Sequence, residues 1–127
     1  MENSVEVINL KKTYGSKLAV NNINFKIKEN EILGLLGPNG CGKTTTIGMI
    51  LGLLKPSSGE ILIEGMKIEE NRINILEKIN FISPYIELPK KLTVKQNLIV
   101  YGKLYNIKNL SSRIEYLVNK LRLEDLL

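Results

Sequence analysis

The sequence "GPNGCGKTT" (residues 37–45) lies between two apolar stretches, "EILGLL" (31–36) and "TIGMILGLL" (46–54). A simple packed core has little use for three glycines in so short a loop, because glycine loses more conformational freedom on folding than any other residue. Residues 37–44 match the pattern G-x-x-x-x-G-K-[ST], which indicates a phosphate-binding loop where a strand precedes it and a helix follows. The stretch therefore predicts such a loop in an α/β domain.

The glycines and the lysine of this loop suit an anion. Gly37, Gly40 and Gly42 can adopt backbone conformations closed to other residues, so the chain can wrap closely around phosphate oxygens. Successive N–H groups then converge on the anion, and a helix that begins near Lys43 adds its positive end. We expect the Lys43 ammonium to contact the terminal phosphates and the charge that develops in the transition state.

The remaining loop residues point to a nucleoside triphosphate with magnesium. Thr44 has a hydroxyl that can complete a magnesium shell, since this ion prefers oxygen ligands. Thr45 is expected to give its backbone N–H, and Cys41 fills a position suited to a small side chain, although positive surroundings favour a reactive thiolate. The predicted nucleotide contacts of the loop are Gly37, Pro38, Asn39, Gly40, Cys41, Gly42, Lys43, Thr44 and Thr45.

Strand patterns occur before the loop. In "VEVINL" (5–10) and "INFKI" (23–27), successive residues point to opposite faces, and apolar residues alternate with polar ones most clearly in the second. In the first, strict alternation places Val7 and Leu10 on opposite faces. Both stretches are predicted to be strands.

Further strands are predicted around the loop. Residues 29–30 predict a turn, and "EILGLL" (31–36) is short, apolar and followed by glycine, which favours a buried strand. Alternation at 60–65 and the apolar residues of 79–83 indicate two more strands. The predicted order is strands, phosphate loop, helix and strands, followed by helices.

A helix is predicted after the loop, over residues 43–54. Pro56 and Gly59 are expected to end it. Its apolar residues recur at helical spacing, at Ile47, Ile50, Leu51 and Leu54.

Later helices have their own start signals. Residues 69–79 are weakly helical. Thr93 with Gln96, and Ser112 with Glu115, match the capping-box pattern that begins a helix. The second part of the chain is therefore expected to be helical.

The composition bounds the class of protein. The 127 residues are 43% hydrophobic and 24% charged, with a net charge of +5, as in one globular domain or part of one. The lysines are scattered, which is typical of a solvated surface; nucleotide phosphates or an acidic lipid surface are the alternatives, and nucleic acid is not expected. With one cysteine, no signal sequence and no apolar run near the roughly 20 residues of a membrane span, we expect a cytosolic protein.

Two long stretches carry a family resemblance. "NLKKTYGSKLAVNNINFKIKENEILGLLG" (9–37) and "GPNGCGKTTTIGMILGLLKPSSGEILIEG" (37–65) resemble the first half of the ATP-binding cassette of ABC transporters. The resemblance implies the P-loop NTPase fold, with ATP and Mg²⁺ as cofactors. It also implies that Tyr14 stacks on adenine, as an aromatic ring can without demanding hydrogen bonds.

The resemblance extends from Val5 to Leu127. "KLTVKQNLIVYGKLYNI" (91–107) and "RIEYLVNKLRLEDLL" (113–127) resemble the helical subdomain of export-type cassettes. The implied organisation is an incomplete cassette, in which residues 1–83 form part of the nucleotide-binding core and residues 84–127 begin the helical subdomain.

Two departures from the family concern catalysis. Pro84 occupies the position of the family's hinge glutamine, which senses magnesium and the attacking water. The sequence also ends before the family's signature motif, Walker B motif and switch histidine would follow, and it contains no histidine. We therefore expect ATP binding with little or no hydrolysis by this chain alone.

Three functions remain open from the sequence. The first is the nucleotide-binding part of a transport ATPase, which implies a transmembrane permease subunit contacted around residues 83–92, a second cassette, and a place at the cytoplasmic face of the membrane. The second is a non-hydrolysing ATP-binding module that regulates or pairs with another cassette. The third, a P-loop kinase or GTPase, is disfavoured because the sequence has no Asn-Lys-x-Asp motif for guanine and Tyr14 favours adenine.

Overall fold

The computed structural model describes residues 3–83 and 87–126. The chain forms two compact units, Met1–Phe81 and Ile82–Leu127. The expected hinge position, Pro84, lies outside the described residues.

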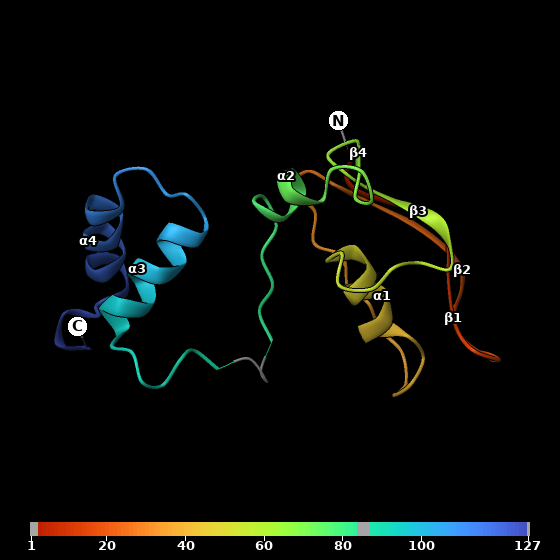
Figure 1. Ribbon diagram of the computed structural model, residues 1–127, viewed down its shortest axis with the longest axis horizontal. Coiled ribbons are helices and arrows are strands. Elements are labelled where there is room, and N and C mark those ends of the chain that lie inside the picture. Colours follow the sequence, from red (N-terminus) through yellow and green to blue (C-terminus); the bar gives the residue numbers. More distant parts are fainter. Residues whose placement is uncertain (1–2, 84–86, 127) are drawn as a thin grey trace. The chain divides into compact units, whose positions relative to one another are not determined.

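Unit 1 contains an antiparallel sheet with the strand order β2-β1-β3-β4 (Figure 1). The strands are β1 (Asn3–Tyr14), β2 (Lys17–Lys28), β3 (Ser58–Ile63) and β4 (Met66–Lys67). The strands predicted at 5–10 and 23–27 are confirmed, and β1 and β2 are longer than predicted. The strand predicted at 60–65 is also present, but it begins and ends two residues earlier, at Ser58 and Ile63.

A bulge in β1 changes the predicted alternation. Val7 and Leu10 were expected on opposite faces, yet both are buried in the same core. Asn9 lies between them with a φ of 48°, and the pairing of β1 with β2 shifts register between Val7 and Leu10. The extra residue of a β-bulge resets the two-residue period, so the strict alternation of the sequence was wrong here.

Two helices complete unit 1. Helix α1 (Lys43–Ile50) lies against one face of the sheet, and α2 (Arg72–Leu76) is a short helix after β4 (Figure 1). The α2 position agrees with the weak helical pattern at 69–79. The buried apolar side chains of the strands, of both helices and of the residue after β4 form one core: Val7, Leu10, Val20, Met49, Ile61, Ile63, Ile68 and Ile75.

Helix α1 ends at Ile50, earlier than predicted. Gly52 follows the C-cap residue Leu51 with a φ of 64°. The Gly52 N–H donates to the Met49 carbonyl at 3.0 Å, and the Leu53 N–H donates to the Gly48 carbonyl at 2.9 Å. This is a Schellman motif, which satisfies the last carbonyls of the helix. A glycine inside the apolar run, rather than Pro56, therefore ends the helix.

The strand predicted at 31–36 is not formed. The segment runs as a coil between β2 and α1, and none of the described strands pairs with it. Ile32 and Leu36 are 98% and 93% exposed. A strand needs hydrogen-bonded neighbours, and here the described strands pair only with one another. The strand predicted at 79–83 is also absent, for the same reason.

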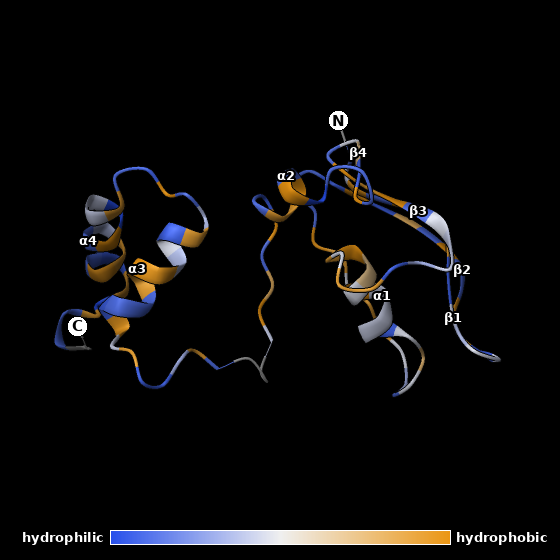
Figure 2. Cartoon of the chain, viewed as in Figure 1, coloured by the Kyte–Doolittle hydropathy of each residue, from blue (hydrophilic) through white to orange (hydrophobic). Residues whose placement is uncertain are grey.

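Unit 2 is helical. It consists of α3 (Val94–Leu104), α4 (Leu110–Leu121) and a 3-10 turn, η1 (Glu124–Leu126), and Figure 2 shows that α3 and α4 both carry apolar as well as polar residues. The capping box of Thr93 and Gln96 is confirmed by the two expected hydrogen bonds, at 3.2 and 2.9 Å.

The second predicted capping box is wrong. Helix α4 begins two residues before Ser112, and its N-cap residue is Asn109 with a φ of 51°. Ser112 and Glu115 therefore lie inside the helix. Asparagine tolerates this left-handed conformation better than most residues, which allows the chain to turn into the helix at Asn109.

Candidate functional site

The phosphate loop adopts a conformation that requires glycine. Gly40 and Gly42 have φ values of 83° and 97°, in the region that L side chains rarely adopt. A Cβ atom at Gly42 would lie 2.4 Å from the Ala19 carbonyl oxygen of β2, whereas a Cβ at Gly40 would meet no atom within 4 Å. The close approach at Gly42 shows that the start of α1 lies directly against β2.

The N-terminus of α1 is open to an anion. Gly42 is its N-cap residue, and among the described residues no side chain caps the helix; its first turn contains no acidic residue. The first hydrogen bond after the loop runs from the Thr46 N–H to the Gly42 carbonyl, at 2.8 Å. The preceding N–H groups at a helix start have no acceptor within the helix, so they can bind phosphate oxygens.

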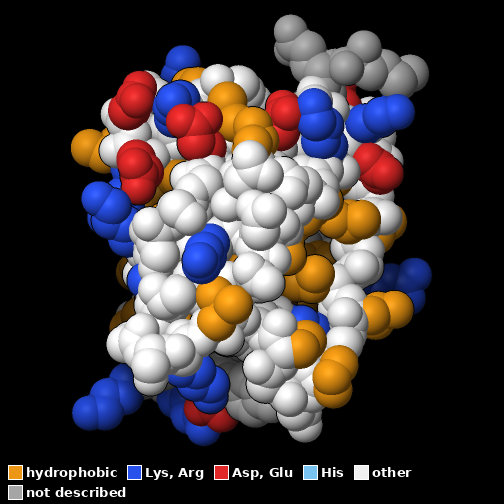
Figure 3. Space-filling view, turned by 90° about the vertical axis from the view of Figure 1, so that its right-hand side faces the viewer, with side chains coloured by type: hydrophobic (Ala, Val, Ile, Leu, Met, Phe, Trp, Pro, Cys, Tyr) orange, Lys and Arg blue, Asp and Glu red, His pale blue; other side chains and the backbone are white. Residues whose placement is uncertain are grey.

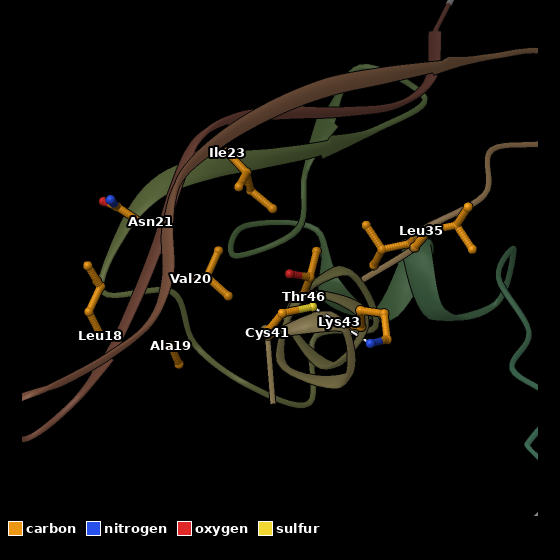
Figure 4. A pocket seen from close by; sticks show the side chains of 11 residues that line it. Leu18, Ala19, Val20, Asn21, Ile23, Leu35, Cys41, Lys43 and Thr46 are labelled. Atoms are coloured by element: carbon orange, nitrogen blue, oxygen red, sulfur yellow. Dashed lines mark hydrogen bonds between the residues drawn. The ribbon is translucent and has the colours of Figure 1, made fainter. Parts of the chain in front are cut away.

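Lys43 folds back over the loop. Its ammonium donates hydrogen bonds to the carbonyl oxygens of Gly37 and Pro38, at 2.5 and 2.7 Å, and lies 3.6 Å from the Cys41 Sγ (Figure 4). Phosphate oxygens are acceptors that carry charge, so they can replace these neutral carbonyls with a stronger, charge-assisted bond.

A pocket of about 310 Å³ brings the two halves of the predicted site together. The end of β1, the start of β2, the loop and the first turn of α1 all contribute to it. The described residues that line it include two lysines and no carboxylate, which favours an anionic ligand. Its residues are Tyr14, Lys17, Ala19, Asn39, Gly40, Gly42, Lys43, Thr44 and Thr45.

A second pocket, of about 340 Å³, borders the first and has a more apolar lining (Figure 4). Cys41 lies here, with Val20 and Thr46, rather than in the pocket that contains Tyr14. Gly37 and Pro38 contribute their backbone carbonyl oxygens, which accept hydrogen bonds from the Lys43 ammonium. The structure thus brings the predicted residues into one region, and it separates Cys41 from the side on which Tyr14 lies.

Sequence reasoning missed Lys17. The register pairs Tyr14 with Lys17 across a two-residue turn, so the lysine enters the pocket beside the tyrosine. The "YGSK" stretch (14–17) contained a usable signal, because a two-residue turn between strands places its flanking residues opposite each other.

Some charged side chains of unit 1 outside this region form ion pairs. Lys26 contacts Glu6 at 2.5 Å and Lys67 contacts Glu60 at 2.7 Å. Figure 3 shows basic and acidic side chains mixed along one edge of a face of the molecule, with apolar side chains around a hollow on the same face. Hydrogen bonding from Lys26 lowers the pKa of the Glu6 carboxyl below its usual range.

The oxygen and nitrogen donors of the pocket suit a magnesium ion that is bound together with a nucleotide. Among the described residues, no group of three or more His, Cys, Asp and Glu side chains is placed to hold a metal ion. Thr44 lies in the pocket with a hydroxyl oxygen. Magnesium commonly binds with few protein ligands and takes its other oxygens from the phosphates and water.

Comparison with known proteins identifies the relatives of this chain. A family model described as ABC transporter matches residues 20–127. The linearmycin resistance ATP-binding protein LnrL of Bacillus subtilis (strain 168) is 43% identical over 99 residues, covering 78% of this chain and 32% of the relative. The bacitracin transport ATP-binding protein BcrA of Bacillus licheniformis is 41% identical over 110 residues, covering 84% and 35%.

Solved structures give the same result for the fold. The ATP-binding subunit of an ABC transporter superimposes with a TM-score of 0.85 and 28% identity, over 97% of this chain and 52% of that one. The cbiO1 protein of Clostridium perfringens, part of the ABC transporter complex cbiONQ, superimposes with a TM-score of 0.80 and 28% identity. The match covers 99% of this chain and 53% of that protein. The chain spans about a third of the length of the curated relatives and about half of these structures.

Proposed function

The chain belongs to the ABC transporter family, and on this premise we propose that it binds ATP as the nucleotide-binding part of a transport ATPase. The observation that carries the proposal is the pocket in which Tyr14, Lys43 and Thr44 meet at the open N-terminus of α1. The other P-loop function considered, a kinase or GTPase, has no comparable support.

Each part of the pocket has a separate role in this proposal. The N–H groups of residues 40–45 and the Lys43 ammonium hold the phosphates, because a helix N-terminus and a lysine both favour negative charge. The Thr44 hydroxyl joins the magnesium shell. The Tyr14 ring stacks on adenine at the other end of the pocket.

We further propose that this chain alone turns over little ATP. Hydrolysis of a phosphoanhydride needs a group that orients and polarises the attacking water, in addition to phosphate-binding groups. The part of the lining that the structure describes supplies phosphate-binding groups but no carboxylate. Release of inorganic phosphate by the purified chain with magnesium is expected to stay near background, and turnover that depends on Lys43 would contradict this part of the proposal.

Coupling to transport requires partners, as in the family. We propose a transmembrane permease subunit and a second cassette, with the chain at the cytoplasmic face of the membrane. Among the described residues, no helix is both long and apolar enough to cross a membrane. The expected permease contact around residues 83–92 includes positions outside the described residues, so it stays a proposal from the family resemblance.

Calorimetric titration with MgATP tests the binding function. The unmodified chain is expected to bind one equivalent, and Lys43→Ala is expected to weaken binding at least about tenfold, since it removes a charge-assisted contact worth roughly 1.5–3 kcal/mol. Lys28→Ala, at the opposite end of β2 from Lys17, is the control and should leave affinity unchanged. Absence of saturable binding, or equal affinities of the unmodified chain and Lys43→Ala, would contradict the proposed function.

A further inference from the structure

The Lys12 side chain contacts Tyr14. Its ammonium lies 5.1 Å from the centroid of the tyrosine ring and donates a hydrogen bond of 2.6 Å to the Lys55 carbonyl oxygen. A cation within about 6 Å of an aromatic ring is attracted to the ring face. Lys12 therefore connects the Tyr14 ring to the segment that follows α1.

The same segment also holds the backbone next to Tyr14. The Thr13 N–H donates to the Ser57 Oγ at 3.0 Å, and the two hydroxyls lie 3.1 Å apart. The Ser57 N–H donates to the Lys11 carbonyl at 2.9 Å. Residues 55–57 thus bind the end of β1 through side-chain as well as backbone contacts.

These contacts link both ends of the pocket. Helix α1 begins at the phosphate loop, and residues 55–57 follow the turn that ends it. The segment in turn holds Tyr14, whose side chain is 48% exposed and would otherwise sample several rotamers. The helix and the segment after it therefore connect the ring to the phosphate-binding amides.

We propose that Lys12 is a positioning residue for nucleotide binding: it holds one face of the Tyr14 ring, so that the opposite face is presented to the adenine base. The proposal rests on the proposed function, because it assigns a role to Lys12 only if Tyr14 stacks on a base. Ser57 supports the same arrangement through its hydrogen bonds to the backbone of Lys11 and Thr13. Lys12 contacts the tyrosine ring and is not among the residues that line the pocket.

A comparison of two ligands isolates this role. Affinities for MgATP and for magnesium tripolyphosphate, which lacks the base and the ribose, are measured by competition calorimetry. Lys12→Met is expected to weaken the affinity for MgATP about three- to tenfold, which converts to roughly 0.7–1.4 kcal/mol of binding free energy. Tripolyphosphate affinity is expected to change no more than in the control Lys28→Met, which removes a charge far from the ring.

Three further variants keep the proposal falsifiable. Lys12→Arg, which can stack on the ring and donate to the Lys55 carbonyl, should restore most of the affinity for MgATP. Lys12→Met should have no further effect on MgATP binding in a Tyr14→Ala background. Ser57→Ala should weaken the affinity for MgATP and leave the affinity for tripolyphosphate unchanged. This variant provides the test if Lys12→Met does not fold.

The outcomes separate this proposal from the function on which it rests. Equal weakening of MgATP and tripolyphosphate by Lys12→Met, or an unchanged affinity for MgATP, would overturn the role of Lys12 while ATP binding stands. A chain that binds neither ligand, or binds both without dependence on Lys43, would overturn the proposed function itself.

Discussion

Gly42 shows how a single residue determines the geometry of the loop. The sequence pattern predicted a glycine with unusual backbone angles, and the structure confirms the positive φ. The pattern could not predict the close approach of the Ala19 carbonyl. That contact joins the loop to a residue of β2 that lies more than 20 positions earlier in the sequence. A local motif specifies its own backbone, whereas contacts with distant strands depend on the whole fold.

Gly42→Ala and Gly40→Ala form a matched pair at this scale. Both place an L side chain at positive φ, which costs about 1–2 kcal/mol, but only the Gly42 variant also forces a Cβ against a carbonyl. We expect Gly42→Ala to lower the free energy of unfolding by about 3 kcal/mol and Gly40→Ala by about 1 kcal/mol. Urea denaturation measures both, and equal losses would contradict the close approach to Ala19.

Helix starts show which element boundaries a sequence can predict. The Thr93 capping box was predictable because both partners lie within four residues. The prediction from the similar pattern at Ser112 was wrong, because α4 begins earlier, after the N-cap residue Asn109 in a left-handed conformation. The predicted strand at 31–36 failed for a non-local reason, since its apolar residues have no pairing partner among the described strands.

Thr93→Ala and Ser112→Ala test this difference. Thr93→Ala removes the hydroxyl that accepts from the Gln96 N–H and is expected to cost about 1 kcal/mol of stability. Ser112→Ala changes an exposed position inside α4 and is expected to be neutral or to stabilise by a few tenths of a kcal/mol, because alanine has the higher helix propensity. Helix content followed by circular dichroism during urea unfolding compares them. A larger loss for Ser112→Ala would contradict the assigned start of α4.

Asn97 holds the start of α3 from within. Its Nδ2 group donates to the carbonyls of Pro89, Leu92 and Thr93 at 3.1–3.4 Å, and the residue is only 6% exposed. Asn97→Ala removes these side-chain hydrogen bonds and is expected to cost about 1 kcal/mol, because the Pro89 and Thr93 carbonyls still accept from backbone N–H groups. Asn97→Asp places carboxylate oxygens against these carbonyls and should cost more at neutral pH. Thermal unfolding of both variants gives the order, and a less damaging Asn97→Asp would contradict the contacts.

At the scale of the whole molecule, the exposed apolar coil at 31–36 favours self-association. Ile32 is almost fully exposed, and an unpaired apolar segment is a template for pairing with another chain. We expect Ile32→Lys to shift the chain toward monomer at a given concentration, whereas Leu53→Lys, another exposed apolar position outside the segment, should shift it less. Sedimentation velocity measures the distribution. A monomeric unmodified chain, or equal effects of the two variants, would contradict this expectation.

The proposed function requires that the ATP phosphates bind at the loop of residues 37–45. Two-dimensional amide NMR spectra, recorded during titration with MgATP and with magnesium tripolyphosphate, test this most directly. Both ligands are predicted to shift the amide resonances of residues 40–45 in a saturable way. Only MgATP is predicted to shift the amide resonance of Tyr14 as well. Saturable shifts confined to other parts of the chain, with the loop amides unchanged, would contradict the account.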